Sequence, residues 1–390
     1  MRQEAIPSRG RVPIKLKKVV HLTSVHPPFD IRIFYKECRT LSRAGYEVVI
    51  IAPHDRDEVV DGIRIRAVRK PRNRRERLTY TAWKIIKAAL EEDADLYQFH
   101  DPELLPWAKL LQVLGKKVIF DMHENYAKSM LTKHWVNPGM RRFLFLLYSF
   151  VEYLLLMKMP VIYVEESYPK YSHIGPSTTV RNMPMLDEIT NIRETKYSIP
   201  TVGYIGDVSV ERGTLTILKS LQVLKEQGVT VHWECIGDLD KNHEMDVLRF
   251  IQQHHLEGIR MRGYLPPMDG WRIISRCHVG LAVLLPLANY VESYPTKMFE
   301  YMALGLPVLV SNFRLYREVV ERYRCGLTVD PEKPEELANA IRWLLEHAQE
   351  SEKMGLRGIE ATMSVFKWET EAQKLLDLYK SLLGSAKGKS

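Results

Sequence analysis

The segment ESYPTKMFEYMALGLPVLV, Glu292–Val310, combines side chains that could bind an anion. Its proline and glycine positions predict a helix from about Pro295 to Leu304. The start of such a helix offers unpaired backbone N–H groups and a positive dipole end, to which Thr296 adds a hydroxyl and Lys297 an ammonium. This combination suits a diphosphate.

Glu300 lies one turn further along the predicted helix, between the apolar residues Phe299 and Met302. A carboxylate in apolar surroundings needs hydrogen-bond donors. A ribose, with its two adjacent O–H groups, would supply them. The alternative is an ordinary helix with a solvated Glu300 at a strand–helix junction, and the segment taken alone leaves both interpretations open.

Two polar segments of the N-terminal half follow predicted strands. His123 comes directly after the apolar run VIFDM, at the carboxyl end of a parallel sheet, where α/β sites form. The alternative is a histidine that caps the next turn. Asp101 follows the run DLYQFH, but Pro102 makes a helix-start role a competing interpretation.

The segment HPPFDIRIFYKE near the start supplies further charged candidates. Arg32 and Lys36 are four residues apart, so they share one face of a helix and would suit an anionic acceptor such as a lipid diphosphate. Together with Asp30 and Asp101 they form a hypothetical acceptor site.

We predict no metal and no cofactor. Asp238 and Asp240 form a D-x-D pair, a pattern that binds metal in proteins of a different fold. Here the pair directly follows the strand-like run VHWECIG, where we expect a turn and no metal. His254 and His255 are adjacent, and on a helix they would point about 100° apart. The four cysteines are far apart and form no C-x-x-C pair, which argues against a disulfide framework or a structural zinc and favours a reducing cytoplasm.

The elements that must position these residues alternate between short apolar runs and amphipathic stretches, and this pattern occurs twice. It predicts an α/β fold with two doubly wound parallel-sheet domains. The length of 390 residues and the 45% of hydrophobic residues fit two soluble globular domains. The polar segment Asn182–Ser198, which shows neither period, is the predicted linker. The basic start runs into a strand pattern, so we do not expect a signal peptide.

One stretch, FLFLLYSFVEYLLLMKM (Phe143–Met159), resembles a membrane span but is short and contains Glu152 and Lys158. We predict a buried core helix. The alternative is a helix that lies in a membrane interface, with Arg141 and Arg142 at its start.

Positive charge is concentrated in the first half. Residues 1–190 contain 31 Lys and Arg against 22 Asp and Glu, whereas residues 191–390 contain 25 against 26. The clusters Arg2–Lys18 and Arg64–Arg77 could attract an anionic membrane surface. Nucleic acid is disfavoured because the second cluster lacks interleaved aromatic residues and no DNA-reading motif is visible. A solvated surface is the simpler alternative.

Glu292 and Glu300, which are separated by seven residues and followed by YMALGLPVLV, resemble the E-x7-E motif of the retaining GT-B glycosyltransferases of family 4. The segments FHDPELLP, VIFDMHENY, VGYIGDVSVERG, RGYLPP and CGLTVDPEKPEELANAI continue the resemblance in order. It implies a GT-B fold with an acceptor-binding domain (1–190), a nucleotide-sugar-binding domain (191–365) and a C-terminal helix (366–390) that crosses back to the first domain.

The resemblance also implies roles for individual residues. Glu300 would bind the donor ribose, Glu292 the donor sugar or its phosphate, and Lys297 the diphosphate. Arg212, in the loop that contains Gly206 and Gly213, would offset the charge of the leaving group. His123 matches the histidine near the reacting sugar carbon.

Two departures from the family pattern bear on the donor. Asp207 replaces a second basic residue, and Ser293–Pro295 replaces a glycine-rich run next to the sugar. Both leave the identity of the donor open.

The expected reaction is transfer of a hexose-type sugar from a nucleoside-diphosphate sugar to a lipid-linked or polysaccharide acceptor, in cell-surface glycan assembly. No obvious nucleophile faces the acceptor, except Glu124, so we favour same-face attack over double displacement. A nucleotide-sugar epimerase and a non-catalytic GT-B scaffold are the alternatives. A nicotinamide enzyme is disfavoured, because no G-x-G-x-x-G run is present.

Overall fold

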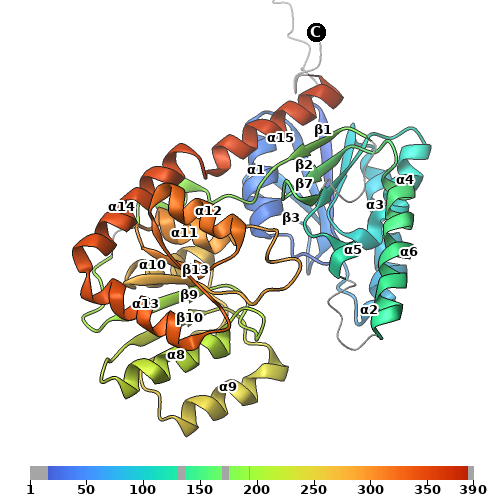
Figure 1. Cartoon of the computed structure of the whole chain (residues 1–390). Helices are drawn as coiled ribbons and strands as arrows, with labels where there is room; N and C mark the ends of the chain where they lie inside the picture. The colour runs from blue at the N-terminus through green and yellow to red at the C-terminus, as the bar shows by residue number, and fades with distance from the viewer. Residues whose placement is uncertain (1–15, 130–136, 169–174, 193, 385–390) are drawn as a thin grey trace, which may run out of the picture.

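The computed structural model describes residues 16–129, 137–168, 175–192 and 194–384. They form two α/β domains, each built on a sheet that helices cover on both faces (Figure 1). The predicted fold class, two Rossmann-like domains that face each other across a cleft, is confirmed.

The first domain contains an eight-stranded sheet in the order β3-β4-β2-β1-β5-β6-β7-β8. Its strands are β1 (Lys18–Leu22), β2 (Glu47–Pro53), β3 (Glu58–Val60), β4 (Ile63–Val68), β5 (Leu96–Phe99), β6 (Val118–Met122), β7 (Val161–Tyr163) and β8 (Ser177–Thr179). All pairs are parallel except the β3–β4 hairpin. The strand order reverses between β1 and β5, and ligand sites form at the carboxyl ends of the strands beside such a switch point.

The second domain contains a six-stranded parallel sheet in the order β11-β10-β9-β12-β13-β14. Its strands are β9 (Thr201–Ile205), β10 (His232–Ile236), β11 (Ile259–Met261), β12 (Val279–Ala282), β13 (Val308–Ser311) and β14 (Gly326–Val329). Its switch point lies between β9 and β12, so the loops after these two strands border a second crevice.

Helices bury both faces of each sheet, which explains why the central strands read as continuous apolar runs. Those of the first domain are η1 (Ile31–Cys38), α1 (Arg39–Arg43), α2 (Arg74–Glu76), η2 (Arg77–Thr81), α3 (Ala82–Glu92), η3 (Pro102–Leu104), α4 (Leu105–Val113), α5 (Tyr126–Ser129) and α6 (Pro138–Leu156). Those that follow are α7 (Leu186–Ile189), α8 (Thr214–Glu226), α9 (Lys241–Gln253), α10 (Pro267–Ser275), α11 (Thr296–Ala303), α12 (Arg314–Tyr323), α13 (Pro334–Glu346), α14 (Ala348–Ser364) and α15 (Trp368–Leu383).

The segment between the two sheets is more ordered than the linker interpretation implied. Met183, Leu186, Ile189 and Ile192 are all buried in the core of the second domain. They recur every three residues, so the segment does have an apolar face, and the short helix α7 places it against α10 and α11.

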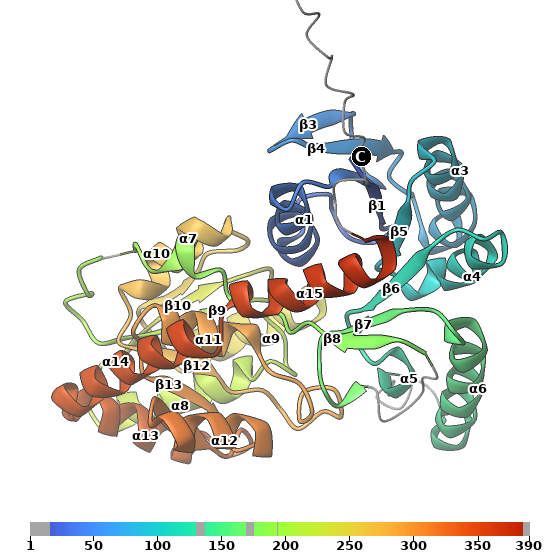
Figure 2. The same cartoon turned by 90° about the horizontal axis from the view of Figure 1, so that it is seen from above.

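The last two helices belong to different domains. Helix α14 packs on α11, whereas α15 crosses to the first domain (Figure 2). There Trp368, Leu375 and Tyr379 are buried in the core of the first sheet, and Trp368 Nε1 donates a hydrogen bond of 3.0 Å to Thr40 Oγ1. This contact joins residues 328 positions apart and holds the domains together outside the cleft.

Helix α6 departs from the prediction of a buried core helix. Glu152 and Leu156 are buried, but large apolar side chains on the other side of the helix, including Phe143 and Phe150, are exposed. The prediction was wrong because α6 is an outer helix that packs by one side against α4 and α5, while apolar residues also occupy its outward side. Among the described residues, no helix is both long and apolar enough to span a membrane.

Candidate active site

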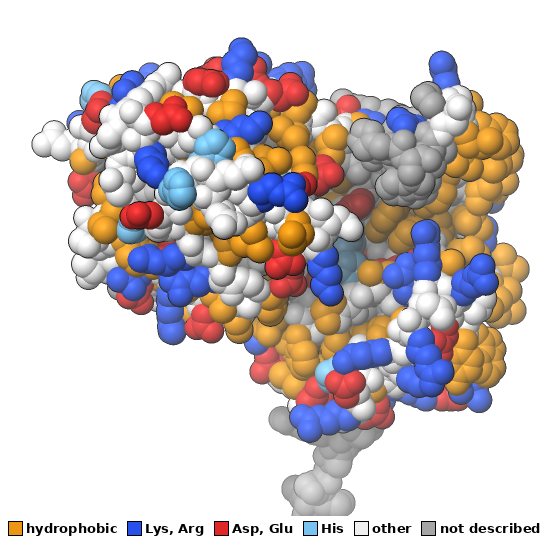
Figure 3. Space-filling view, turned by 90° about the horizontal axis from the view of Figure 1, so that it is seen from below, with side chains coloured by type: hydrophobic (Ala, Val, Ile, Leu, Met, Phe, Trp, Pro, Cys, Tyr) orange, Lys and Arg blue, Asp and Glu red, His pale blue; other side chains and the backbone are white. Residues whose placement is uncertain are grey.

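A cleft of about 700 Å³ separates the two domains, at the carboxyl ends of both sheets. Figure 3 shows the molecule hollowed at this place, with a histidine side chain deep in the hollow. Nine predicted site residues line the cleft: Asp30, Arg32, Lys36, His123, Gly206, Arg212, Thr296, Lys297 and Glu300. The other three, Asp101, Gly213 and Glu292, are not among the lining residues.

Lys297 is the group on the second-domain wall that most clearly indicates an anion site. Its side chain is buried at the start of α11, and its Nζ has no hydrogen-bond partner among the described residues. The ammonium lies 3.8 Å from the centre of the Tyr204 ring. Burial, and then the nearby charge of Arg212, lower the pKa of Lys297 well below its usual value. An anion in the cleft would supply the missing partner.

Gly206 is adapted to this lysine. A Cβ at Gly206 would lie 2.8 Å from Lys297 Nζ, and the backbone there has φ +125°. A side chain at this position would therefore cover the ammonium and strain the loop after β9. The glycine leaves the cation open to a ligand.

Glu300 follows one turn later on α11 and lines the same wall. Burial raises the pKa of Glu300, while the charge of Lys36 and a hydrogen bond from Trp271 oppose this shift. The carboxylate thus lies in partly apolar surroundings, as the sequence predicted. It can accept hydrogen bonds from a diol placed against α11.

Arg212 stacks on Tyr290, with its guanidinium carbon 4.7 Å from the ring centre. Its Nη2 is 3.9 Å from an Asp207 carboxylate oxygen, but the Asp207 side chain is 84% exposed, so water screens this pair. Gly213 has a different role. A Cβ there would lie 1.8 Å from the Val283 carbonyl oxygen, so glycine permits close packing of the loops after β9 and β12.

Glu292 contacts the other domain instead of the cavity. Its carboxylate pairs with the ammonium of Lys128 on α5, and its carbonyl oxygen accepts a hydrogen bond of 2.9 Å from Ser167 Oγ. Both partners belong to the first domain. In this conformation, Glu292 helps to join the two edges of the cleft.

His123 is the most prominent group on the first-domain wall. It follows β6, as predicted, and its Nε2 lies 2.9 Å from Oδ2 of the buried Asp121. Burial alone would raise the pKa of Asp121, but the Arg32 guanidinium and the imidazoles of His123 and His100 hold it well below its usual value. Because an ionised carboxylate only accepts hydrogen bonds, His123 carries its proton on Nε2. Its Nδ1 is left as an acceptor.

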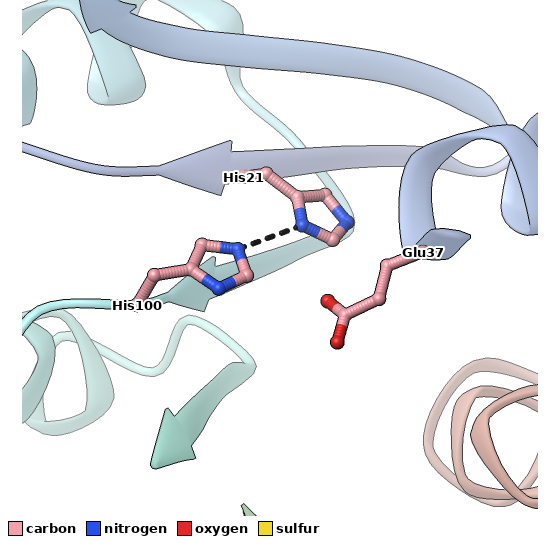
Figure 4. A group of neighbouring side chains, drawn as sticks. All are labelled: His21, Glu37 and His100. Atoms are coloured by element: carbon pink, nitrogen blue, oxygen red, sulfur yellow. Dashed lines mark hydrogen bonds between the residues drawn. The ribbon is translucent and has the colours of Figure 1, made fainter. Parts of the chain in front are cut away.

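Behind His123 lies a buried hydrogen-bonded chain. His100 Nδ1 is 3.2 Å from Asp121 Oδ2, and His100 Nε2 is 3.0 Å from His21 Nδ1 (Figure 4). Burial lowers the pKa of both imidazoles, so both are neutral. Tyr379 of α15 lies 3.4 Å from His21 Nε2 and donates a 2.5 Å hydrogen bond to Gln98. The crossing helix therefore contacts the support of the site.

The predicted acceptor residues are mostly engaged within the protein. Arg32 makes two hydrogen bonds to Asp121, of 3.0 and 2.8 Å, and one of 3.0 Å to the Val180 carbonyl. Asp30 caps η1 through the amides of Arg32 and Ile33. These contacts explain how the segment folds and leave little of Arg32 for an anionic acceptor.

Lys36 and Asp101 differ in position. Lys36 lines the cleft, donates a 2.5 Å hydrogen bond to Asn182 Oδ1, and has a pKa lowered to about 8 by burial. Asp101 is buried behind the wall and accepts hydrogen bonds from Thr23 and Ser24. Asp101 thus shapes the loop after β1.

Sequence reasoning missed Glu165, which lines the cleft after β7. Burial raises the pKa of Glu165 to about 8, although its Oε1 accepts a hydrogen bond of 2.8 Å from the Tyr294 amide of the opposite domain. Its position after the strand PVIYV was the available signal. Sequence reasoning also missed Asp121, because it lies inside β6, the strand that precedes His123.

Among the described residues, two groups have ligand atoms close enough to hold a metal: His21, Glu37 and His100, which are buried, and His100, Asp121 and His123, of which His123 is partly exposed. Both groups adjoin the Arg32 guanidinium, which lies 3.0 Å from Glu37 and 2.8 Å from Asp121. This fixed positive charge disfavours a cation there. Of the D-x-D pair, Asp238 lines the cleft, whereas Asp240 caps α9.

The fold and the cleft define a class of two-domain α/β proteins with a buried cation at the second-domain wall, and the comparisons give the family. A model described as "Glycosyl transferases group 1" matches residues 187–361, and one described as "Glycosyltransferase Family 4" matches residues 32–154. The chain belongs to the group 1 glycosyltransferases of the GT-B fold.

Curated relatives match over parts of their length. The spore coat protein SA of Bacillus subtilis is 26% identical over 45% of this chain and 47% of its own. The glycogen synthase of Thermus caldophilus is 24% identical over 55% of this chain and 45% of its own. The chain thus spans about half the length of these curated relatives.

Solved structures share the fold over nearly the whole chain. The sucrose-phosphate synthase of Thermosynechococcus elongatus has a TM-score of 0.73 at 18% identity and covers 94% of this chain and 99% of its own. Anabaena HepE in complex with UDP-glucose has a TM-score of 0.71 at 14% identity and covers 93% and 99%.

Proposed function

We propose that this chain is a retaining glycosyltransferase that transfers a hexose-type sugar from a nucleoside-diphosphate sugar to a lipid-linked or polysaccharide acceptor. The observation that carries the proposal is the buried ammonium of Lys297 at the start of α11, which has no hydrogen-bond partner in the part of the chain that the structure describes and lines the cleft beside Gly206. The process would be cell-surface glycan assembly on the cytoplasmic side of a membrane.

The donor would lie against the second domain. Its diphosphate would meet the start of α11, Lys297 and Arg212, and its ribose diol would meet Glu300. The complexes of Anabaena HepE with UDP and with UDP-glucose, which share this fold, support a nucleotide in the cleft. Lys297, Arg212 and the dipole of α11 would offset the charge of the diphosphate without a metal.

The acceptor would approach from the first domain, past His123. His123 would accept a hydrogen bond at Nδ1 from a hydroxyl of the bound sugar, because Asp121 fixes the other nitrogen as a donor. Glu292 pairs with Lys128 in this conformation and would contact the donor sugar after a change in domain position.

Same-face attack fits the state of two carboxyl groups of the first domain, neither of which is free to act as a nucleophile. Asp121 is bound by Arg32 and the imidazoles, and the raised pKa keeps Glu165 protonated near neutral pH. In this route the bond from the anomeric carbon to the diphosphate oxygen breaks, the acceptor oxygen bonds to the same face, and the diphosphate takes the acceptor proton. Glu124 also lines the cleft and is the candidate nucleophile of a double displacement. Glu124→Gln should abolish turnover if Glu124 is the nucleophile and should preserve it in same-face attack.

The proposal is tested by incubating the chain with UDP-, GDP- and ADP-sugars and measuring nucleoside diphosphate release, with and without EDTA. One donor class should turn over, with EDTA having no effect, and His123→Ala should slow it by about 100-fold or more. A non-catalytic scaffold is the second candidate, because the Asp207 carboxylate lies 3.9 Å from Arg212 and would repel the diphosphate that Arg212 attracts. Nucleotide binding without any release in the presence of acceptor extracts would favour the scaffold.

A further inference from the structure

Helix α6 exposes a continuous apolar side. Its exposed large apolar residues are Met140, Phe143, Leu146, Leu147, Phe150, Val151, Leu154 and Met157 just beyond its end. These positions recur at spacings of three and four residues, so they lie along one side of the helix. A helix side that faces water ordinarily carries polar residues, and large exposed apolar patches mark interaction surfaces.

Helix α4 extends this surface. Leu110 and Val113 on α4, and Leu114 just beyond its end, add three exposed apolar side chains, with Val113 74% exposed. Lys109 on α4 donates a hydrogen bond of 2.8 Å to the Met157 carbonyl at the end of α6, so the two helices are tied together. Figures 1 and 2 both show α3, α4 and α6 in a row along the outer edge of the first domain.

Helix α3 and the preceding η2 contribute aromatic and basic groups. Tyr80 and Trp83 are exposed, and the ammonium of Lys84 lies 5.4 and 5.2 Å from their ring centres. Lys87 lies 5.8 Å from the Trp83 ring. Exposed Trp and Tyr beside Lys are typical of the water–lipid boundary, where the ring is buried and the cation remains among headgroups.

Further cations surround the apolar side chains. Arg142 at the start of α6, Lys158 after its end, and Arg74 and Arg75 on α2 are exposed. In the cluster Arg64–Arg77, by contrast, Arg64 and Arg66 pair with Glu92 and do not add to this set. Of the predicted cluster Arg2–Lys18, residues 2–15 lie outside the described residues, and Lys17 and Lys18 pair with Asp95 and Glu92.

We propose that this surface, named here the α3–α4–α6 face, docks on an anionic lipid bilayer. The apolar side chains of α6 and α4 would enter the acyl boundary, and the surrounding lysines and arginines would meet the headgroups. Charge argues against a second copy as the occupant, because the exposed cations of this face, which include Lys87, Arg142 and Lys158, would face the same cations of the other copy and repel them.

The face and the cleft are compatible with one orientation. The view of Figure 3 shows both the hollow between the domains and the hydrophobic edge of the first domain. A bilayer against this edge would therefore lie beside the first-domain wall, from which a lipid-linked acceptor would enter. This last step rests on the proposed function, whereas the docking itself does not.

The test is flotation with neutral phosphatidylcholine vesicles and with vesicles that also contain phosphatidylglycerol. The wild-type chain should float with the anionic vesicles, and high salt should weaken its binding. The double variant Phe143→Ser, Phe150→Ser should lower binding by about tenfold or more, and Lys84→Glu, Lys87→Glu should reduce binding to anionic vesicles.

Two controls keep the test interpretable. Met245→Ser, Leu248→Ser removes two exposed apolar side chains of α9 on the second domain and should bind vesicles like the wild type. Nucleotide binding, measured by calorimetry on every variant, reports folding and tests the donor site separately from docking. Equal binding to both kinds of vesicle, no binding, or unchanged binding by the α6 variant would overturn the proposal. So would a dimer that the α6 variant abolishes.

Discussion

The two walls of the cleft are built in opposite ways. The second-domain wall presents Lys297 with no hydrogen-bond partner among the described residues, whereas the first-domain wall presents His123 at the end of a fully connected chain through Asp121 and His100. An unpaired buried ammonium lowers the stability of the free protein and favours a bound anion. A connected chain instead fixes the position and tautomer of a side chain. One wall is therefore adapted to capture a ligand and the other to orient one.

The largest expected effect comes from Asp121→Asn. The substitution leaves the buried Arg32 without its ionised partner and should lower the free energy of unfolding by about 3–5 kcal/mol. It also frees the tautomer of His123, so sugar transfer should slow even where the variant is folded. Chemical denaturation and turnover at low temperature measure the two effects. The matched control is Asp269→Asn on α10, which removes an exposed partner of Arg272 and should change neither stability nor turnover.

Lys297→Met tests the opposite wall. It should weaken nucleoside diphosphate binding by about 10- to 100-fold, as expected for a lost hydrogen bond between charged groups. The free protein should at the same time melt at a higher temperature, because a buried charge has been removed. Lys219→Met, on an exposed position of α8, should alter neither property. Lower stability of the free Lys297→Met protein would contradict the contrast between the walls.

Glu165 connects the two walls and gives a pH test. Its pKa of about 8 exceeds that of an unfolded chain, so the folded protein retains a proton that the unfolded chain has lost. Stability should therefore fall as pH rises from about 5 to 8, by up to about 1.4 kcal/mol per pH unit from this group. Glu165→Gln should flatten the dependence of the melting temperature in this range. An unchanged slope would contradict this assignment.

The smallest expected effect is that of Tyr379→Phe. The loss of its hydrogen bond to Gln98 should cost about 1 kcal/mol of stability and slightly loosen the chain behind His123. Differential scanning calorimetry should show a decrease of about 2–4 °C in melting temperature. Tyr80→Phe, at an exposed position, should leave it unchanged.

The sequence predicted those parts of the site that depend on local signals. The helix expected from Pro295 to Leu304 is α11, Thr296–Ala303, because the residues that start and stop it lie directly beside its two ends in the sequence. The partners of the site residues could not be predicted in this way. Glu292 pairs with a lysine 164 positions away, and Arg32 with an aspartate 89 positions away. Such pairs depend on how the two domains pack.

The errors about whole elements have a similar cause. The apolar residues of α6 indicated a helix but did not indicate which side would be covered, since that depends on neighbours far along the chain. The apolar face of α7, by contrast, was present in the sequence as a period of three and was overlooked between polar residues. Periodicity identifies elements better than it identifies their surroundings.

The central claim is that the second-domain wall is a nucleoside diphosphate site. Calorimetric titration with UDP, GDP and ADP, without added metal, on the wild type and on Glu300→Ala tests it most directly. We expect one nucleotide to bind tightly to the wild type and Glu300→Ala to lose most of this affinity, because its ribose contact is gone. Absence of binding by all three nucleotides, or equal binding by the variant, would contradict it.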